Sequence, residues 1–418
     1  MKISARIFLI VTGILLLSHY LPAGYWLLAE KQQRAPYVYY SCISNRFLFY
    51  RFGVGEPLRV DSDGKVYDRD EFEQLLPLDN YSQLLRDGKM PKTVNGIPIA
   101  VEKLRRERIN LRVKPVMFDG PGVDLYPLLE AESGRVRLEL PPDFMRLGKS
   151  VEFIDAKSNT LLAEKSAKFL EAFKAQGFVF PATIVGGNPS TMKPFDEGYF
   201  IADNQGSVFH LRQVQGAPVL KRVSDVVKPE EKARWTSLKP RFIQVQEQDN
   251  HEVRAVIIDE GGQANIVVGP DYRLVTVPLK DYNPTTMVLN MRGDLLNRLA
   301  TVSSEHHLEA IVMNRNYDLV DRHSEPLRER RETTAGKIAG ALFPFTLEFE
   351  DKNSGYIGFY AQPGNAMMWI VNGSLLLILT GWILFRKQRL PGRWLDLLAV
   401  ATTGLFGFVL VWLIPRSE

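Results

Sequence analysis

The residue groups that most often support catalysis occur in this chain only as fragments. The run Gly186-Gly187-Asn188-Pro189-Ser190-Thr191 has the paired glycines of a phosphate-binding loop, but it lacks the Lys-Ser/Thr end that contacts the phosphates. His251-Glu252 begins a zinc-protease motif, yet Ala255 stands where the second His is required. The sequence has no Gly-x-Ser-x-Gly nucleophile elbow. A turn between strands is the better interpretation of the glycine run, and we predict no ATPase in this chain.

Adjacent carboxylates, which can act as an acid–base pair, occur at Asp196-Glu197 and at Asp259-Glu260. Such pairs arise by chance in a chain with 48 acidic residues. Asp196-Glu197 follows Lys193-Pro194, so a salt bridge where a strand begins explains the pair as well as catalysis does. We therefore predict no catalytic residues, no cofactor-binding residues and no enzyme activity.

Possible metal ligands are scattered along the sequence. The six histidines are His19, His210, His251, His306, His307 and His323. Two adjacent rings point to opposite sides of an extended segment, so His306 and His307 cannot readily chelate one ion. A copper or zinc site assembled from distant histidines stays open, and the metal ligands are left undefined.

The single cysteine, Cys42, excludes an intramolecular disulfide and any zinc or iron–sulfur site built from cysteines. It follows the aromatic run Tyr37-Val38-Tyr39-Tyr40. We predict that its thiol is buried and inert.

Composition describes a folded chain whose charge is unevenly distributed. Of 418 residues, 45% are hydrophobic and 11% aromatic, which excludes a disordered protein. The formal net charge is +4, but residues 30–365 carry 45 basic and 46 acidic residues, a net charge of −1. A near-neutral middle region has no electrostatic footprint for nucleic acid.

Both ends of the chain are apolar and carry a net positive charge. Residues 7–29 contain 23 residues without a formal charge, enough to cross a bilayer core of about 30 Å. A cleaved signal peptide is the alternative, but its apolar core is shorter and ends in small residues. Here Tyr20, Tyr25 and Trp26 crowd the far end, as in an interfacial belt. We therefore predict an uncleaved anchor over residues 1–29.

Two further apolar runs near the C-terminus predict a membrane hairpin. Transmembrane helices are expected at 367–385 and 394–414, joined by the short basic loop 386–393. Both basic clusters belong on the cytoplasmic side, namely Lys2 and Arg6 at the first span and Arg386, Lys387, Arg389 and Arg393 in the loop. The prediction is a multi-pass protein of the bacterial inner membrane, with residues 30–366 in the periplasm and an external tail at 415–418.

The region between the spans reads as mainly β, with short helical inserts. Strands are expected at Phe47–Phe52, Val136–Leu140, Val151–Ile154, Phe178–Ile184, Tyr199–Ile201, Val208–Val214, Val253–Ile258, Ile266–Val268, Leu274–Val277, Met287–Leu289, Ala310–Met313 and Tyr356–Tyr360. Hairpin turns that start with Asp or Asn and end in Gly are expected at 61–64, 203–206, 259–262 and 290–293. A degenerate β-propeller is the predicted fold, and a large β-sandwich is the alternative.

Three helices are expected in this region, at 70–76, 80–86 and 161–176. Pro77 and Gly88 end the first two. Thr160 is the predicted cap of the third, and Gly177 ends it.

Three groups of segments resemble an uncharacterised bacterial family of triple-spanning envelope proteins with a periplasmic domain. They are Leu75-Leu-Pro-Leu-Asp-Asn-Tyr81, then Phe180-Pro-Ala182 with Gly187-Asn-Pro189, then Asp196-Glu-Gly-Tyr-Phe200 with Gly206-Ser-Val-Phe-His210. The resemblance extends over the full chain. It implies a Gram-negative envelope protein that is often encoded beside ATP-binding-cassette (ABC) transporter components, and it defines no catalytic residues.

The functional prediction is a non-enzymatic accessory subunit of a membrane transport system of the ABC type. Its partners would be an inner-membrane permease with its ATPase subunit and the lipid bilayer, and not nucleic acid. Small residues in the C-terminal spans would let neighbouring helices approach closely: Gly373, Ser374, Gly381, Gly404 and Gly407. The alternatives are a metal- or small-ligand-handling periplasmic propeller protein and a carbohydrate-acting enzyme that uses two acids.

Overall fold

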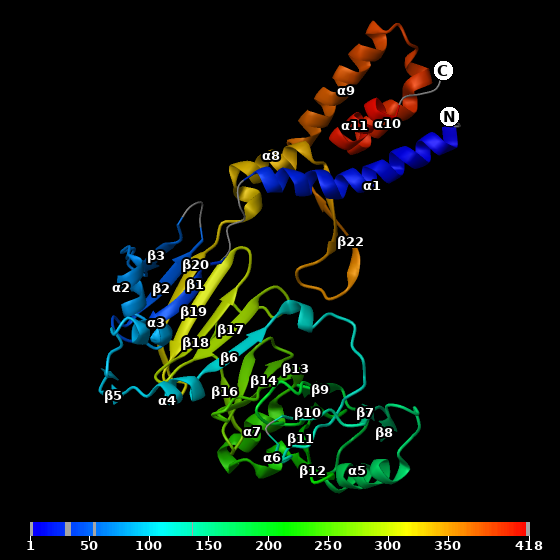
Figure 1. Ribbon diagram of the computed structural model, residues 1–418. Helices are drawn as coiled ribbons and strands as arrows, with labels where there is room; N and C mark the ends of the chain where they lie inside the picture. Colours follow the sequence, from blue (N-terminus) through cyan, green and yellow to red (C-terminus); the bar gives the residue numbers. More distant parts are fainter. Residues whose placement is uncertain (1–2, 30–34, 53–55, 136, 415–418) are drawn as a thin grey trace. The chain divides into compact units, whose positions relative to one another are not determined.

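A computed structural model describes residues 3–29, 35–52, 56–135 and 137–414. The chain divides into two compact units, which are described separately (Figure 1). The helical unit comprises residues 1–36, 51–58 and 326–418, and the β-unit comprises residues 37–50 and 59–325. Strands and helices account for about 30% and 31% of the structure.

Antiparallel meanders form most of the β-unit. The first joins β9 (Ile184–Gly187), β10 (Tyr199–Ala202), β11 (Val208–Val214) and β12 (Ala217–Arg222). The second joins β13 (Pro240–Val245), β14 (Val253–Asp259), β15 (Ala264–Val268) and β16 (Arg273–Thr276). The third joins β6 (Ile109–Val113), β17 (Val288–Gly293), β18 (Arg298–Ser303), β19 (His307–Met313) and β20 (Leu319–Pro326).

Smaller sheets complete the β-unit. They are β1 (Tyr37–Ser41) with β2 (Arg46–Arg51) and β3 (Leu58–Asp61), β4 (Thr93–Val94) with β5 (Ile97–Pro98), and β7 (Asp143–Leu147) with β8 (Val151–Asp155). Within the described residues, no sheet closes into a barrel.

Three apolar clusters pack these sheets face to face in chain order. One lies between β10–β11 and the β7–β8 hairpin with helix α5 (Ala163–Ala175), where Phe153, Phe169 and Phe209 are fully buried. The next joins β10–β11 to β13–β15 through side chains such as Phe200. The last joins β14–β15 to β6 and β17–β19 through side chains such as Ile266. Stacked meanders are therefore the framework of the β-unit.

Most of the predicted strands are present, which confirms a β-rich region. The whole chain is not mainly β, because helices occupy as many residues as strands. In the segment expected at Val136–Leu140, Val136 lies outside the described residues and 137–140 form no strand. The strand expected at Phe178–Ile184 begins only at Ile184.

Three of the four predicted turns are present. At 61–64, 203–206 and 259–262, the starting Asp side chain accepts backbone N–H groups and the final Gly has a positive φ. The prediction at 290–293 is wrong, since this run lies inside β17. Gly293 serves close packing there, because an added Cβ would lie 2.9 Å from Ile109. The turn follows at 294–297, where Asp294 accepts from the amides of Leu296 and Asn297.

The predicted helices correspond to α2 (Arg69–Gln74), α3 (Tyr81–Arg86) and α5. Thr160 does not cap α5, because Leu162 occupies the N-cap position. The other helical turns of the β-unit are α4 (Val101–Arg106), η1 (Pro115–Met117), α6 (Val223–Val226) and α7 (Pro229–Ser237).

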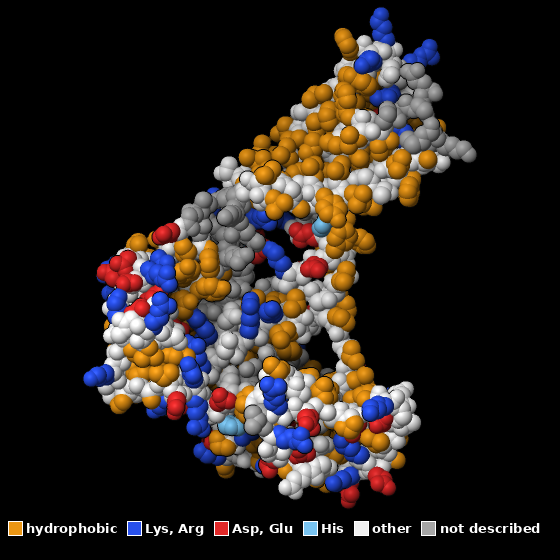
Figure 2. Space-filling model, viewed as in Figure 1, with side chains coloured by type: hydrophobic (Ala, Val, Ile, Leu, Met, Phe, Trp, Pro, Cys, Tyr) orange, Lys and Arg blue, Asp and Glu red, His pale blue; other side chains and the backbone are white. Residues whose placement is uncertain are grey.

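The helical unit contains five helices, a hairpin and two short turns in its described residues. They are α1 (Ile3–Leu28), α8 (Thr334–Leu342), α9 (Met368–Phe385), α10 (Trp394–Thr403), α11 (Leu405–Leu413), β21 (Phe345–Glu350), β22 (Ile357–Pro363), η2 (Arg330–Glu332) and η3 (Leu390–Arg393). α1 and α9 are long and apolar enough to cross a membrane, and hydrophobic side chains cover the visible face of this unit (Figure 2). Their length and composition indicate membrane association.

The run expected as one transmembrane helix at 394–414 is instead broken between α10 and α11. Gly404 has φ +52° and ψ −120°, which only glycine adopts without strain. An added Cβ would lie 1.9 Å from Oδ1 of Asn372 on α9. The chain therefore breaks at the point where α9 approaches the backbone of Gly404. The three apolar runs of the sequence do not by themselves give the number of transmembrane spans.

A buried charged contact joins α1 to α10. Arg6 lies 2.7 Å from Asp396, and Arg393 lies 2.9 Å from the other oxygen of that carboxylate. Arg6 also donates to the backbone oxygen of Ile414. The basic residues expected to mark one side of the membrane are thus partly used in helix packing. Lys2 and the tail 415–418 lie outside the described residues.

Candidate functional site

A buried ion network organises the loop at residues 188–198, which connects β9 to β10. The Lys193 ammonium is only 3% exposed. It lies 2.5 Å from Asp196 Oδ1 and 2.7 Å from Glu247 Oε1. Glu247 also accepts from the side chain of Asn188 and from the backbone N–H of Glu197. Lys193 and Glu247 therefore hold both ends of the loop.

The network continues through Glu197 into the interface between the first two meanders. The Glu197 carboxylate pairs with Arg254 on β14. The backbone oxygen of Glu197 lies 2.7 Å from Nε2 of His210, and Nδ1 of His210 lies 2.8 Å from the Tyr272 hydroxyl. His210 stacks on Phe200 with 4.3 Å between ring centroids. Since a carbonyl only accepts, Nε2 donates to Glu197 and Nδ1 accepts from Tyr272.

Burial controls the protonation of these groups. Burial lowers the pKa of His210 to about 3, so the imidazole is neutral at physiological pH. Burial raises the pKa values of Asp196, Glu197 and Glu247, while the nearby cations Lys193 and Arg254 favour the charged carboxylates. The acids are therefore ion-pair partners enclosed by protein, and Oδ2 of Asp196 is buried without a hydrogen-bond partner among the described residues.

The sequence drew attention to part of this network. Asp196-Glu197 was a candidate acid pair, and the structure places it in ion pairs where β10 begins. Two of the three groups of segments that carry the family resemblance meet here, at 180–189 and 196–210. Sequence reasoning missed Glu247, Arg254 and Tyr272, which come from the next meander. Only the Lys193–Asp196 spacing gave a local signal.

The loop exposes an apolar tip on the outside of this network. Met192 is 92% exposed, and Pro189 and Pro194 on either side of it are also exposed. Each of these residues neighbours one that the network holds, Asn188 or Lys193. The charged side chains thus point inward while the apolar side chains point to solvent. A rigid apolar projection is suited to contact with another protein.

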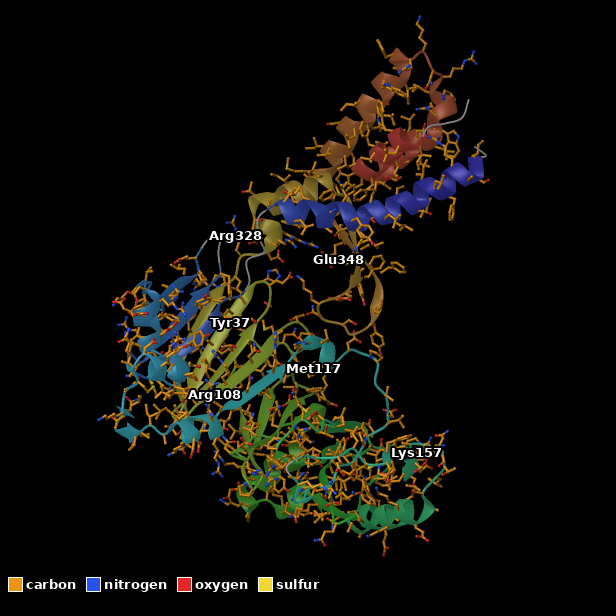
Figure 3. All side chains as sticks on the ribbon, in the orientation of Figure 1. Tyr37, Arg108, Met117, Lys157, Arg328 and Glu348 are labelled. Atoms are coloured by element: carbon orange, nitrogen blue, oxygen red, sulfur yellow. The ribbon has the colours of Figure 1, made fainter. Side chains whose placement is uncertain are left out.

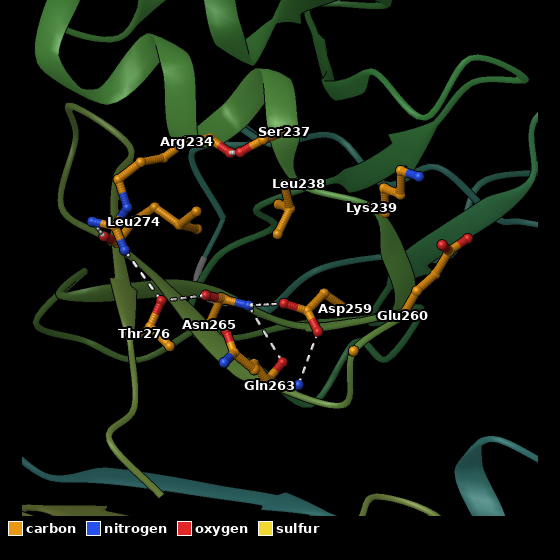
Figure 4. A pocket seen from close by; sticks show the side chains of 11 residues that line it. Arg234, Ser237, Leu238, Lys239, Asp259, Glu260, Gln263, Asn265, Leu274 and Thr276 are labelled. Carbon is orange, nitrogen blue, oxygen red and sulfur yellow. Dashed lines mark hydrogen bonds between the residues drawn. The ribbon is translucent and has the colours of Figure 1, made fainter.

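A separate pocket lies between α7 and the second meander (Figure 4). It has a volume of about 460 Å³ and is lined by Arg234, Ser237, Leu238, Lys239, Asp259, Glu260, Gly261, Gln263, Asn265, Leu274 and Thr276. A hydrogen-bond chain runs along its floor from Arg234 to Thr276, then to Asn265 and Asp259. These floor atoms already bond one another, so the pocket has no set of converging free groups on its floor.

One cluster in the described chain has the spacing of metal ligands, namely Asp281, His307 and Glu309. Glu309 already pairs with Arg322 and accepts the backbone N–H groups of Lys280 and Asp281. A guanidinium on the carboxylate competes directly with a cation, so these residues fit a metal poorly.

Three other histidines, His19, His251 and His323, make separate aromatic contacts. His323 contacts the rings of Phe47 and Phe49, and His251 packs against Phe195. In the helical unit, the His19 ring packs on Tyr20. Among the described residues, these three histidines do not belong to the cluster that has metal-ligand spacing.

Comparison with known proteins gives one family. No curated protein matches the chain. The profile described as "Domain of unknown function (DUF4857)" matches residues 37–313, which contain every segment that carried the family resemblance. The expectation of an uncharacterised family is confirmed to that extent, while the link to ABC transporters stays a prediction. The match covers well over half of the chain, which therefore belongs to the DUF4857 family.

Proposed function

We propose that this protein is a non-enzymatic, membrane-anchored subunit whose β-unit binds another component of a membrane transport system. The proposal depends on one observation, namely that the loop at 188–198 separates its charged side chains from its apolar tip. Its charged groups are buried and paired, and its apolar tip at Met192 is exposed. Such an arrangement favours protein contact over bond-making chemistry.

The same loop supports preorganised binding. A partner that meets a loop already held by Lys193, Asp196 and Glu247 does not have to order it, which lowers the entropic cost of association. Methionine is unbranched and polarisable, so it adapts to an apolar groove on a partner. We propose a permease with its ATPase subunit as the complex that carries such a groove, reached on its external face.

The topology is part of the proposal. α1 would cross the bilayer with its N-terminus in the cytoplasm, and α9 with α10–α11 would form the C-terminal membrane hairpin. Support comes from the apolar surface of the helical unit and from the basic loop at Arg386, Lys387 and Arg389. The β-unit would then lie in the periplasm.

We also propose that the stacked meanders are blades of an incomplete propeller. The first two have four strands each, follow one another along the chain and pack face to face. Their first strands, β9 and β13, contact each other, as innermost strands of neighbouring blades do.

The test uses the full-length protein, expressed from its native locus with an affinity tag. Met192→Asp should lower the yield of copurified permease and ATPase at least tenfold, because a charge enters the apolar contact. Leu161→Asp is the matched control, since Leu161 is also exposed but lies outside the loop. Equal yields from both variants, or no permease with the wild-type protein, would contradict the proposal.

A separate measurement tests the topology. Cysteines placed at Met192 and at Lys387 should react differently with a membrane-impermeant maleimide when the outer membrane of whole cells is permeabilised. Residue 192 should be labelled and residue 387 protected. Labelling of residue 387 alone would reverse the proposed orientation.

A further inference from the structure

The β21–β22 hairpin has one apolar face and one polar face. Paired positions share a face, so Leu347 lies with Ala361, and Glu348 lies with Tyr360. The apolar face comprises Phe345, Leu347, Phe349, Phe359, Ala361 and Pro363, whereas Ile357 lies beyond a register shift and pairs with Glu350. The polar face carries Thr346, Glu348, Tyr360 and Gln362 (Glu348 is labelled in Figure 3). A hairpin with this division requires a cover for its apolar side.

Only the base of the apolar face is covered within the described part of the helical unit. Leu347 is buried, and its carbonyl accepts from Nδ1 of His19 on α1 at 2.8 Å. The Phe349 ring packs on His19, with 4.7 Å between ring centroids. Farther along the hairpin, Phe359 is 79% exposed and Ile357 is 85% exposed. A two-stranded hairpin that exposes such side chains is marginal in water.

We propose that the outer part of this hairpin lies in the bilayer interface, with Phe359 at the level where headgroups meet acyl chains. The proposal rests on the membrane location given above. The apolar face is continuous with α1, a helix able to cross a membrane, through the contacts at His19. Its other end is tied as closely, because β22 ends at Pro363 and α9 begins at Met368.

The depth follows from the backbone. A two-stranded hairpin leaves unpaired N–H and C=O groups along both edges, and these cannot enter hydrocarbon without a large cost. The polar face adds the Glu348 carboxylate, which bonds the Gln362 side chain. Headgroups and interfacial water satisfy such groups, whereas the bilayer centre does not. The hairpin should therefore lie flat and shallow, with its polar face toward water.

The test compares two neighbouring positions on opposite faces, Phe359→Cys and Tyr360→Cys. Each full-length variant is labelled with an environment-sensitive NBD fluorophore and reconstituted into vesicles of phosphatidylethanolamine and phosphatidylglycerol. Cys42 should not react, because it is buried and burial raises the pKa of its thiol to about 12. At residue 359, a lipid nitroxide at acyl carbon 5 should quench several-fold more strongly than one at carbon 12. At residue 360, aqueous iodide should be the stronger quencher.

Equal iodide quenching at both positions in membrane-integrated protein would overturn the hairpin inference and leave the proposed function intact. Shielding of residue 359 from lipid and aqueous quenchers alike would also overturn it, since a protein surface would then cover the face. Carbonate extraction of the wild-type protein checks the premise, because release from the membrane would refute both proposals. If Phe359→Cys does not fold, Ala361→Cys places the label on the same face, because Ala361 pairs with Leu347 and is exposed.

Discussion

Lys193 and Glu247 lie 2.7 Å apart between Nζ and Oε1, and their side chains are only 3% and 1% exposed. The two residues are 54 positions apart and belong to connections in different meanders. This contact therefore fixes the first meander against the second as well as the loop that bears Met192. Because each buried charge needs its own partner, the ion pairs fix one position of the loop. A purely apolar contact would allow the loop to shift.

Lys193→Met should destabilise the β-unit, because it leaves the Asp196 and Glu247 carboxylates buried without their cation. Removing one partner of a buried ion pair costs about 3–5 kcal/mol. Urea unfolding of the full-length protein in mild detergent, followed by intrinsic tryptophan fluorescence, measures the loss, and the buried Trp235 contributes the signal of the β-unit. Lys174→Met is the control and should change stability by less than about 0.5 kcal/mol, since Lys174 is exposed. Equal stability of the two variants would mean that the network is not required for the fold.

His210 predicts a specific dependence of stability on pH. Its pKa is about 3 in the folded chain, below the usual value of about 6.5. The unfolded chain thus binds a proton first, and folding stability falls as pH decreases from about 7 toward 3. At pH 5 this amounts to about 2 kcal/mol relative to pH 8. Above pH 7 the residue should have no effect on the pH profile.

His210→Gln isolates this effect from the carboxylates, whose raised pKa values act in the opposite direction at lower pH. Urea unfolding of wild type and variant at pH 8 and pH 5 gives the comparison. The wild-type protein should lose about 2 kcal/mol more than the variant over this interval. Parallel profiles would show that His210 titrates alike in both states.

The sequence predicted local structure where one segment carries its own signal. The alternation at 208–214 matches β11, and Asp203 with Gly206 makes the hairpin turn before it. The sequence was misleading where contacts between distant elements determine the local structure. The run at 290–293 has turn residues, yet Gly293 is required because β6 packs beside it. Neighbouring elements, and not local propensity, set those positions.

Only the part of the candidate site that is formed by residues close together in the sequence could be predicted. Lys193 and Asp196 are three residues apart, so a salt bridge between them was a reasonable interpretation. Glu247 in the connection after β13 and Arg254 on β14 reach the same network, and nothing in their own neighbourhoods marks them as partners. Pairing of buried charges that lie far apart in the sequence depends on how the meanders stack. The sequence contains no local pattern that predicts this stacking.

Gly404→Ala should disrupt the packing of α10 and α11 on α9. A positive φ costs a non-glycine residue about 1–2 kcal/mol, and the added Cβ would overlap Oδ1 of Asn372. Thermal unfolding of the purified protein in detergent should show a clear drop in midpoint. Gly381→Ala is the matched control, because Gly381 lies in α9 with open space around it. A similar midpoint for both variants would indicate that the break at Gly404 is not needed.

The contact between Arg6 and Asp396 should couple the first helix to the C-terminal helices. Asp396→Asn leaves Arg6 and Arg393 without their shared carboxylate inside an apolar unit, and Arg6→Gln leaves Asp396 with Arg393 alone. The double variant should therefore be less destabilised than the sum of the single variants, with a coupling energy of about 0.5–3 kcal/mol. Detergent unfolding of all four proteins gives this cycle directly. Strict additivity would mean that Arg6 and Asp396 are neighbours without energetic coupling, and that apolar packing alone holds α1 against α10 and α11.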